Sequence, residues 1–221
     1  MLSFLQQVDL RLLHSINSDW ANPILDWFMP WLTDYSVWKW PMLVVAAALL
    51  IWGGYRERLL VVMTLVLVLM GEGVNGTIKH LVNRPRPFQH LQNIRHVDRS
   101  GIQISKPSPV DKGRSMPSSH AANNVAFAFL MSVIYGRWGR LVWIGALLVA
   151  YSRIYIGSHY PSDVVAGLLL ALSYSKATVW AVERIWQNVG RRWLAASYGR
   201  HPHLLAGPCE LTTIASAKRE I

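Results

Sequence analysis

A segment from Ser152 to Asp163 combines an arginine, a histidine and an aspartate at the border between two apolar runs. Arg153 lies near the end of the first run, where an unpaired charge is costly and usually marks a functional site. His159 precedes Pro161, which favours the first turn of a new helix. Asp163 follows His159 by four residues, so its carboxylate can reach one imidazole nitrogen and leave the other facing a substrate. A capped turn with a chance histidine is the alternative.

A second segment reads Pro117-Ser118-Ser119-His120 and opens another apolar run. Proline followed by two serines indicates a helix start, and the free backbone N–H groups of a first turn form an anion-binding site. His120 would lie in that turn. The alternative is an ordinary serine cap with an incidental histidine.

A third segment, Lys79 to Pro87, ends an apolar run with two cations. Pro85 and Pro87 stop the helix and favour extended backbone, so Arg86 can fold back beside Lys79. A lysine and an arginine together suit the charge of a phosphate, and the guanidinium can make two parallel hydrogen bonds to it. The alternative is a basic segment that only flanks the membrane and in which the prolines end the helix.

Long apolar runs must position these segments. Apolar residues make up 52% of the 221 residues and charged residues 15%, a balance that favours an all-α integral membrane bundle over a soluble helical protein with an apolar core. Most runs approach the ~20 residues that cross the hydrocarbon layer. The sequence predicts an interfacial helix over 3–17, a short helix over 22–32 interrupted by Pro30, and spans over 37–53, 58–80, 119–135, 140–156 and 161–183.

Alternation of these spans brings the three polar segments to one membrane face. The end of the second clear span, the start of the third, the end of the fourth and the start of the fifth must meet there. The short basic connections predict which face is cytoplasmic, but the loop over 81–118 carries about as many positive charges, so the charge count alone leaves orientation undecided. The cytoplasmic candidates are Arg56, Arg58, Arg137, Arg140 and the flank over 184–192.

The distribution of the remaining charges and histidines argues against a nucleic-acid-binding protein and against a metal-dependent one. The net charge of +10 is spread over membrane flanks, the loop and the tail, so we expect no nucleic-acid partner. No metal or other cofactor is expected, because the other histidines form no ligand cluster; they include His80, His90, His96, His201 and His203. We expect one membrane-embedded domain over 1–187, a poorly ordered basic cytoplasmic tail over 188–221, and no obligate protein partner.

The three segments match, in order and spacing, the signature motifs of the type 2 phosphatidic acid phosphatase superfamily. The motif residues are Lys79, Arg86-Pro87, Pro117-Ser118-Ser119-His120, Ser152-Arg153, His159 and Asp163. The resemblance covers about residues 60–180. Ser119 stands where many members have glycine, a change that keeps the backbone N–H and narrows the pocket.

The resemblance implies an all-α membrane bundle of about six spans and a phosphatase mechanism. His159 would attack phosphorus to form a phosphohistidine, Asp163 would orient its ring, and His120 would protonate the leaving oxygen. The phosphate oxygens would be held by Lys79, Arg86, Arg153 and the N–H groups near Ser118 and Ser119. No metal is needed in this scheme.

The resemblance also implies a lipid phosphate substrate, such as undecaprenyl diphosphate, phosphatidylglycerophosphate, phosphatidic acid or lipid A. Such chains lie in the bacterial inner membrane, with a site on the extracytoplasmic face. A phosphotransferase that passes the phosphoryl group to a second lipid shares the first half-reaction, and a membrane transporter or binding protein is a further alternative. An acyl hydrolase with Ser118 as nucleophile is disfavoured, because the residues around Ser118 do not form the Gly-x-Ser-x-Gly motif of such enzymes. For Glu72 three roles are open: an ion pair with Lys79, a proton relay or a structural hydrogen bond.

Overall fold

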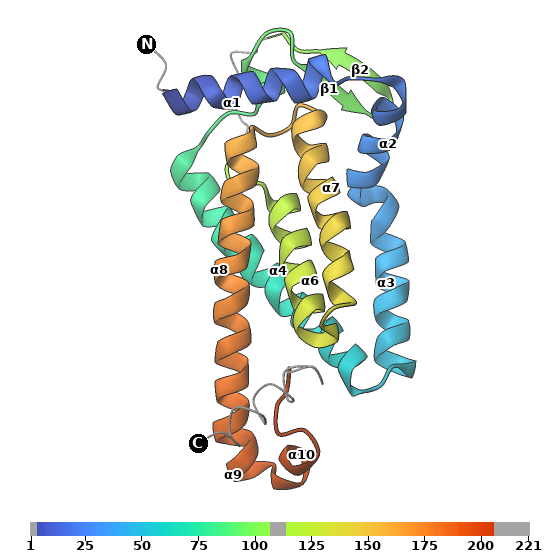
Figure 1. The fold of residues 1–221 in the computed structure, drawn as a ribbon, viewed down its shortest axis with the longest axis vertical. Helices are drawn as coiled ribbons and strands as arrows, with labels where there is room; N and C mark the ends of the chain where they lie inside the picture. Colours follow the sequence, from blue (N-terminus) through green and yellow to red (C-terminus); the bar gives the residue numbers. More distant parts are fainter. Residues whose placement is uncertain (1–3, 107–113, 206–221) are drawn as a thin grey trace.

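The protein is a bundle of long helices with a small two-stranded hairpin at one end (Figure 1). The computed structural model describes residues 4–106 and 114–205. Its five long helices are α3 (Tyr35–Trp52), α4 (Tyr55–Val82), α6 (Ser119–Tyr135), α7 (Val142–Tyr155) and α8 (Pro161–Ile185). They lie within three residues of the five predicted spans at every end, and the predicted all-α membrane-bundle class is confirmed.

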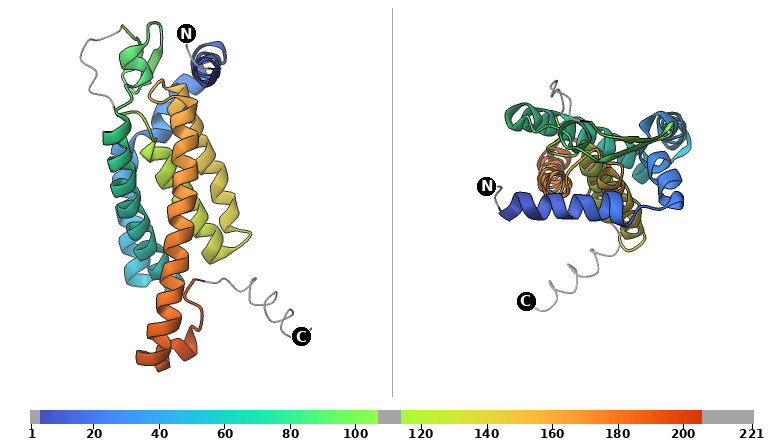
Figure 2. Two further views of the ribbon diagram at one scale, coloured as in Figure 1. Left: turned by 90° about the vertical axis from the view of Figure 1, so that its left-hand side faces the viewer. Right: turned by 90° about the horizontal axis from the view of Figure 1, so that it is seen from above.

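The N-terminal segment lies across one end of this bundle. Helix α1 (Phe4–His14) runs nearly at right angles to the long helices, continues into the π-helical turn η1 (Ser15–Asp19), and is followed by α2 (Pro23–Thr33) (Figures 1 and 2). The Asn22 side chain caps α2 by accepting a hydrogen bond from the Leu25 amide. Helix α2 continues through Pro30, whose ring is buried, instead of being interrupted there as predicted.

A short helix and a hairpin form within residues 81–118, which the sequence predicts to be a loop. Helix α5 (Pro87–His90) precedes the antiparallel strands β1 (Arg95–Asp98) and β2 (Gly101–Ile104). The Asp98 carboxylate closes the turn by accepting from the amides of Ser100 and Gly101. Strands of four residues are too short for sequence periodicity to reveal.

Helix α6 lies at the centre of the bundle, packed against α4, α7 and α8 (Figures 1 and 2). Small side chains cover much of its surface, which allows close approach of helices as membrane interiors favour. Its fully buried residues include Ala121, Ala122, Val125, Ala126 and Ala128.

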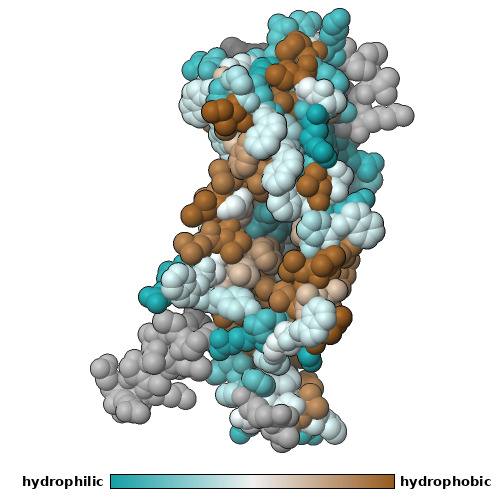
Figure 3. Space-filling view, turned by 90° about the vertical axis from the view of Figure 1, so that its right-hand side faces the viewer, coloured by the Kyte–Doolittle hydropathy of each residue, from teal (hydrophilic) through white to brown (hydrophobic). Residues whose placement is uncertain are grey.

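The outer surface of the bundle is apolar. Figure 3 shows hydrophobic residues gathered along the middle of the molecule and hydrophilic residues at both ends. Within the described residues, three helical stretches are long and apolar enough to cross a membrane: Tyr35–Trp52, Tyr55–His90 and Pro161–Trp193. This surface matches the polarity of a bilayer. The total of about six membrane spans remains a prediction.

The described part of the tail, residues 188–205, is partly helical. Helix α8 continues through η3 (Trp186–Gly190) into α9 (Arg191–Trp193) and α10 (Ala195–Arg200). The chain then folds back, because the Glu183 carboxylate accepts from His203 Nδ1 and the Leu204 amide, each at 3.0 Å, and Leu205 is buried in the bundle core. Residues 206–221, the rest of the predicted tail, lie outside the described residues.

Candidate active site

Four helix ends meet at the end of the bundle that carries α1 and the hairpin (Figure 1), as the sequence predicts. They are the end of α4, the start of α6, the end of α7 and the start of α8. The Ser118 amide donates to the Asp163 carbonyl oxygen at 3.0 Å, which joins the starts of α6 and α8. Lys79 Nζ donates to Ser119 Oγ at 2.7 Å, which joins the end of α4 to the start of α6. Gly167 allows this approach, because an added Cβ would lie 2.7 Å from the Ser118 carbonyl oxygen.

His159 lies in the turn between α7 and α8, and only 2% of its surface is exposed. Its Nδ1 is 3.8 Å from Asp163 Oδ2, too far for a direct hydrogen bond. Ser115 Oγ bridges the gap: it donates to Asp163 Oδ2 at 2.5 Å and lies 3.4 Å from His159 Nδ1. With Nδ1 directed at this pair, Nε2 is on the opposite side of the ring.

Burial lowers the pKa of His159 from about 6.5 to about 4, and the positive charges of Arg153 and Arg86 act in the same direction. The Asp163 carboxylate opposes the shift, but it does not outweigh them. The imidazole is therefore neutral at pH 7, which is the form that can attack an electrophile.

Asp163 is fully buried, and both of its carboxylate oxygens have partners. Oδ2 accepts from the Tyr160 amide at 2.9 Å as well as from Ser115, completing a capping box at the start of α8. Oδ1 accepts from Arg84 Nη1 at 2.7 Å. These bonds fix the rotamer of the carboxylate relative to His159.

The turn that carries His159 is shaped by a glycine and by the hairpin. Gly157 has a positive φ of 73°, and an added Cβ would lie 2.5 Å from the Arg95 carbonyl oxygen on β1. Asn17 donates to the carbonyl oxygens of Tyr155 and Arg95 at 2.6 and 2.8 Å. The Arg95 guanidinium in turn pairs with both oxygens of Asp26 at 2.7 Å. The hairpin, η1 and α2 therefore anchor the end of α7.

Three cations gather around the two motif histidines. Arg153 is buried, donates from Nη1 to Thr33 Oγ1 at 2.7 Å, and its Nε has no partner among the described residues. Electrostatic interactions of His120 and His159 with the cations indicate that all of them share one site; the interacting cations are Lys79, Arg86 and Arg153 for His120, and Arg86 and Arg153 for His159. Such a cluster is costly in a buried site unless an anion balances it.

The start of α6 offers a different set of donors from the one predicted. The Ser118 amide is already bonded to Asp163, so it is not available to a ligand. Ser118 Oγ is buried and has no partner among the described residues, and first-turn N–H groups such as that of Ser119 have no intrahelical acceptor. The half-buried His120 follows in the same turn. This end of α6 suits an anion placed beside His159.

Comparison with known proteins identifies the family of this chain. The family model described as the PAP2 superfamily matches residues 58–187, more than half of the chain. The chain belongs to the PAP2 superfamily. The matched range contains all three motif segments.

Two curated PAP2 relatives show how far the similarity extends. A putative undecaprenyl-diphosphatase of Escherichia coli is 27% identical over 169 residues, which cover 74% of this chain and 78% of the relative. A lipid A 4'-phosphatase of Bacteroides thetaiotaomicron is 29% identical over 175 residues, which cover 77% of this chain and 75% of the relative.

Solved structures support the PAP2 fold. Aquifex aeolicus LpxE has a TM-score of 0.57 at 22% identity, covering 77% of this chain and 93% of its own. A transmembrane PAP2 type phosphatidylglycerolphosphate phosphatase from Bacillus subtilis has a TM-score of 0.56 at 20% identity, covering 83% and 90%. Family and relatives together make this chain an integral membrane phosphatase that hydrolyses lipid phosphate esters.

Three residues of this PAP2 site were missed by the sequence reasoning. Ser115 and Arg84 both bind the Asp163 carboxylate, and Asp9 binds Arg84. Asp9 carried a detectable signal, because it interrupts the apolar stripe of the predicted N-terminal helix on the side that includes Leu5 and Leu12. Ser115 and Arg84 carried none beyond their closeness to a motif.

Glu72 pairs with a neighbouring helix. Its Oε1 accepts from Asn123 Nδ2 at 3.1 Å, and its charge also acts on Lys79. Within residues 4–106 and 114–205, no group of three or more His, Cys, Asp or Glu side chains could hold a metal ion.

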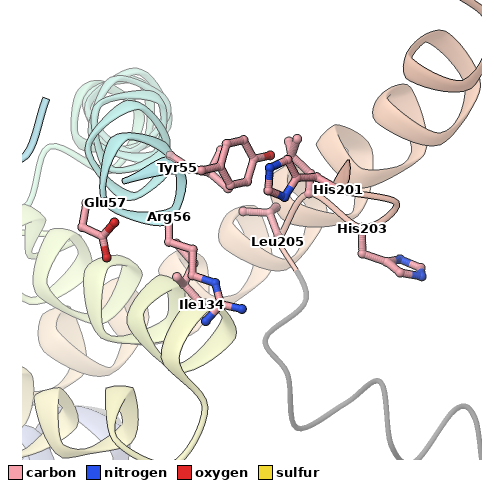
Figure 4. Close-up of a pocket in the computed structure, with 9 residues that line it drawn as sticks. Tyr55, Arg56, Glu57, Ile134, His201, His203 and Leu205 are labelled. Atoms are coloured by element: carbon pink, nitrogen blue, oxygen red, sulfur yellow. The ribbon is translucent and has the colours of Figure 1, made fainter. Parts of the chain in front are cut away.

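A pocket of about 280 Å³ lies at the opposite end of the bundle and contains none of the motif residues. It is lined by the start of α4, the end of α6 and the folded-back tail, and Figure 4 shows Tyr55 beside His201 among the lining residues. The rings of these two residues stack with centroids 4.0 Å apart. The pocket is separate from the phosphatase site, because α4 and α6 run the length of the bundle between them.

Proposed function

We propose that this phosphatase works through a covalent phosphohistidine on His159. The observation that carries the proposal is a buried imidazole, neutral at pH 7, whose Nδ1 faces the Ser115–Asp163 pair while cations gather around it. A neutral, oriented imidazole is a competent nucleophile, and the cations supply the charge that a phosphoryl group requires.

In the first half-reaction, Nε2 of His159 attacks phosphorus and the bond from phosphorus to the leaving oxygen breaks. His120, protonated to the imidazolium when the negatively charged phosphate is bound, donates that proton to the leaving oxygen, so the lipid leaves as an alcohol or as a monophosphate. Asp163 stabilises the positive charge that develops on the ring. Phosphate binding falls to Lys79, Arg86, Arg153, the Ser118 hydroxyl and the Ser119 amide.

In the second half-reaction, His120 accepts a proton from water as the water oxygen attacks phosphorus. The bond between phosphorus and nitrogen then breaks, inorganic phosphate leaves, and His159 returns to its neutral state. The same two histidines therefore serve both steps, with His120 changing from acid to base.

For the substrate we propose undecaprenyl diphosphate first and lipid A second. The support is that curated relatives from Escherichia coli and Bacillus subtilis are named undecaprenyl-diphosphatases, one of them putative, and another relative is named a lipid A 4'-phosphatase. We propose the bacterial inner membrane as the location and its extracytoplasmic face for the site. The support is the resemblance of the three motif segments to the family, because the charge count alone leaves orientation undecided.

The test is phosphate release by the full chain in lipid nanodiscs, with EDTA present, from undecaprenyl diphosphate, lipid A, phosphatidylglycerophosphate and phosphatidic acid. We expect release that persists in EDTA, is fastest for undecaprenyl diphosphate, and is lost in His159→Ala. Equal release by that variant would refute the nucleophile. Appearance of the phosphate on a second lipid in place of water would identify a phosphotransferase.

A further inference from the structure

A chain of paired charges, in which two buried aspartates flank the partly exposed Arg84, links α1 to the proposed catalytic pair. Arg84, just after α4, donates from Nη1 to Asp163 Oδ1 and to Ser162 Oγ, both at 2.7 Å. Its Nη2 donates to Asp9 Oδ2 at 2.6 Å. The guanidinium carbon lies 3.7 Å from the centroid of the Tyr160 ring. The guanidinium is thus held on two edges and one face.

Asp9 is fixed as firmly from the other side. It is 6% exposed, and its Oδ1 accepts from the Ser162 amide at 2.8 Å while Oδ2 accepts from Ser162 Oγ at 2.6 Å. Ser162 lies in the first turn of α8, so a carboxylate of α1 satisfies an otherwise unpaired N–H of the helix that carries Asp163. Helix α1 therefore docks onto the start of α8 through a charged side chain.

From this geometry we propose that Arg84, held by Asp9, is a positioning residue that orients Asp163 toward His159. The inference rests on the function proposed above. Ser115 and the Tyr160 amide occupy Oδ2 of the carboxylate, and Arg84 is its partner at Oδ1, so the arginine prevents the carboxylate from rotating away from the imidazole.

Phosphate binding is the competing role for Arg84, and the contacts argue against it. Three of its five N–H donors already have partners, two of them carboxylates, and one face of its guanidinium covers Tyr160. Arg153, in contrast, keeps Nε without a partner among the described residues. A phosphate approaching Arg84 would also meet the negative charges of Asp9 and Asp163.

The experiment compares kcat and KM for Arg84→Gln, Arg84→Lys, Asp9→Asn and the double variant Asp9→Asn/Arg84→Gln, as full chains in nanodiscs. We expect Arg84→Gln to lower kcat by about 10- to 100-fold, the range typical of residues that orient a functional group through hydrogen bonds. KM should change less than about twofold, because an interaction made only in the transition state lowers kcat alone. Arg84→Lys should recover part of kcat, and Asp9→Asn should add little in the Arg84→Gln background, since residues of one network are not additive.

Two matched variants serve as controls. Arg99→Gln removes a more exposed arginine that also pairs with an aspartate, and Arg11→Gln removes an exposed charge from α1 itself; both should keep kcat. A raised KM with unchanged kcat in Arg84→Gln, or unchanged values in both Arg84→Gln and Asp9→Asn, would overturn the proposal.

If Arg84→Gln does not fold, Arg84→Lys and Asp9→Asn decide by the same two values: a lower kcat at constant KM supports the role and an unchanged kcat refutes it. His159→Ala in the same preparation separates this question from the proposed function. Activity that survives His159→Ala refutes the mechanism itself, whereas loss in His159→Ala with a normal Arg84→Gln refutes only the positioning role.

Discussion

Replacing Asp163 by asparagine tests the electrostatic part of the mechanism, because it removes one charge and nearly no volume. In the wild-type protein, Asp163 Oδ2 lies 3.8 Å from His159 Nδ1, and both side chains are almost fully buried. At an effective dielectric constant of about 20, a unit charge pair at this distance interacts by about 4 kcal/mol. That interaction forms fully only when the ring becomes positive as the nucleophile, so its loss should lower kcat about a thousandfold.

The assay measures kcat by phosphate release at saturating lipid substrate, with the phosphoenzyme trapped in parallel from radiolabelled substrate. The trap uses an alkaline quench, because phosphohistidine is labile in acid. Asp163→Asn should lower the rate of phosphoenzyme formation while KM stays nearly constant. Asp19→Asn removes an exposed carboxylate at the end of η1 and is the matched control.

A loss smaller than about fivefold in Asp163→Asn would refute the reasoning, since a charge pair at this distance interacts by about 1 kcal/mol even when it is screened as in bulk water. A loss shared by Asp19→Asn would point to a nonspecific effect of charge on the fold. A raised KM with unchanged kcat would mean that Asp163 contacts the ground-state substrate instead of the imidazole.

Three further predictions follow from the same structure. Because burial lowers the pKa of His159 to about 4, the neutral nucleophile should persist as pH falls and be lost only near pH 4; a pH–rate profile with the ionisation of the substrate phosphate divided out checks this, and an acid limb near 6.5 would contradict it. His120→Ala should lower kcat by about 10² to 10⁴-fold with a lipid phosphate but far less with p-nitrophenyl phosphate, whose leaving group needs no proton; equal losses would argue against an acid role. Gly157→Ala should lower the thermal unfolding temperature, because a side chain there has a positive φ and clashes with the Arg95 carbonyl oxygen, at a cost of about 2 kcal/mol or more; Gly136→Ala, which also has a positive φ but open space around it, should cost less, and the reverse order would contradict the clash.

The helices could be predicted because residues close to each helix end, such as proline and glycine, determine where the helix begins and ends. Helix α6 (Ser119–Tyr135) starts two residues after Pro117 and ends before Gly136, as predicted. Helix α4 extends three residues earlier and two later than predicted, because it includes the polar residues Tyr55 to Glu57 and continues to Val82, shortly before Pro85. Apolar runs bounded by proline and glycine therefore determine where the motif residues emerge.

The surroundings of the site could not be predicted, because they depend on contacts between distant parts of the chain. Ser115 meets Asp163 across 48 positions and Asp9 meets Arg84 across 75. Nothing in the local spacing of a serine or an arginine specifies such a partner. The hairpin was missed for a related reason: β1 is four residues long, and its role is to hold Arg95 against Asn17.

These distant contacts explain how a turn at a membrane surface keeps an imidazole in place. The turn after α7 carries the proposed nucleophile His159, so it needs support on the sides that substrate does not occupy. Asn17 and Arg95 hold the end of α7, while Asp9 holds the start of α8. Both supports come from the N-terminal segment and the hairpin, outside the residues that carry the family motifs. We therefore expect substitutions of Asp9 in α1, Asn17 in η1 and Arg95 in β1 to lower activity without loss of the bundle.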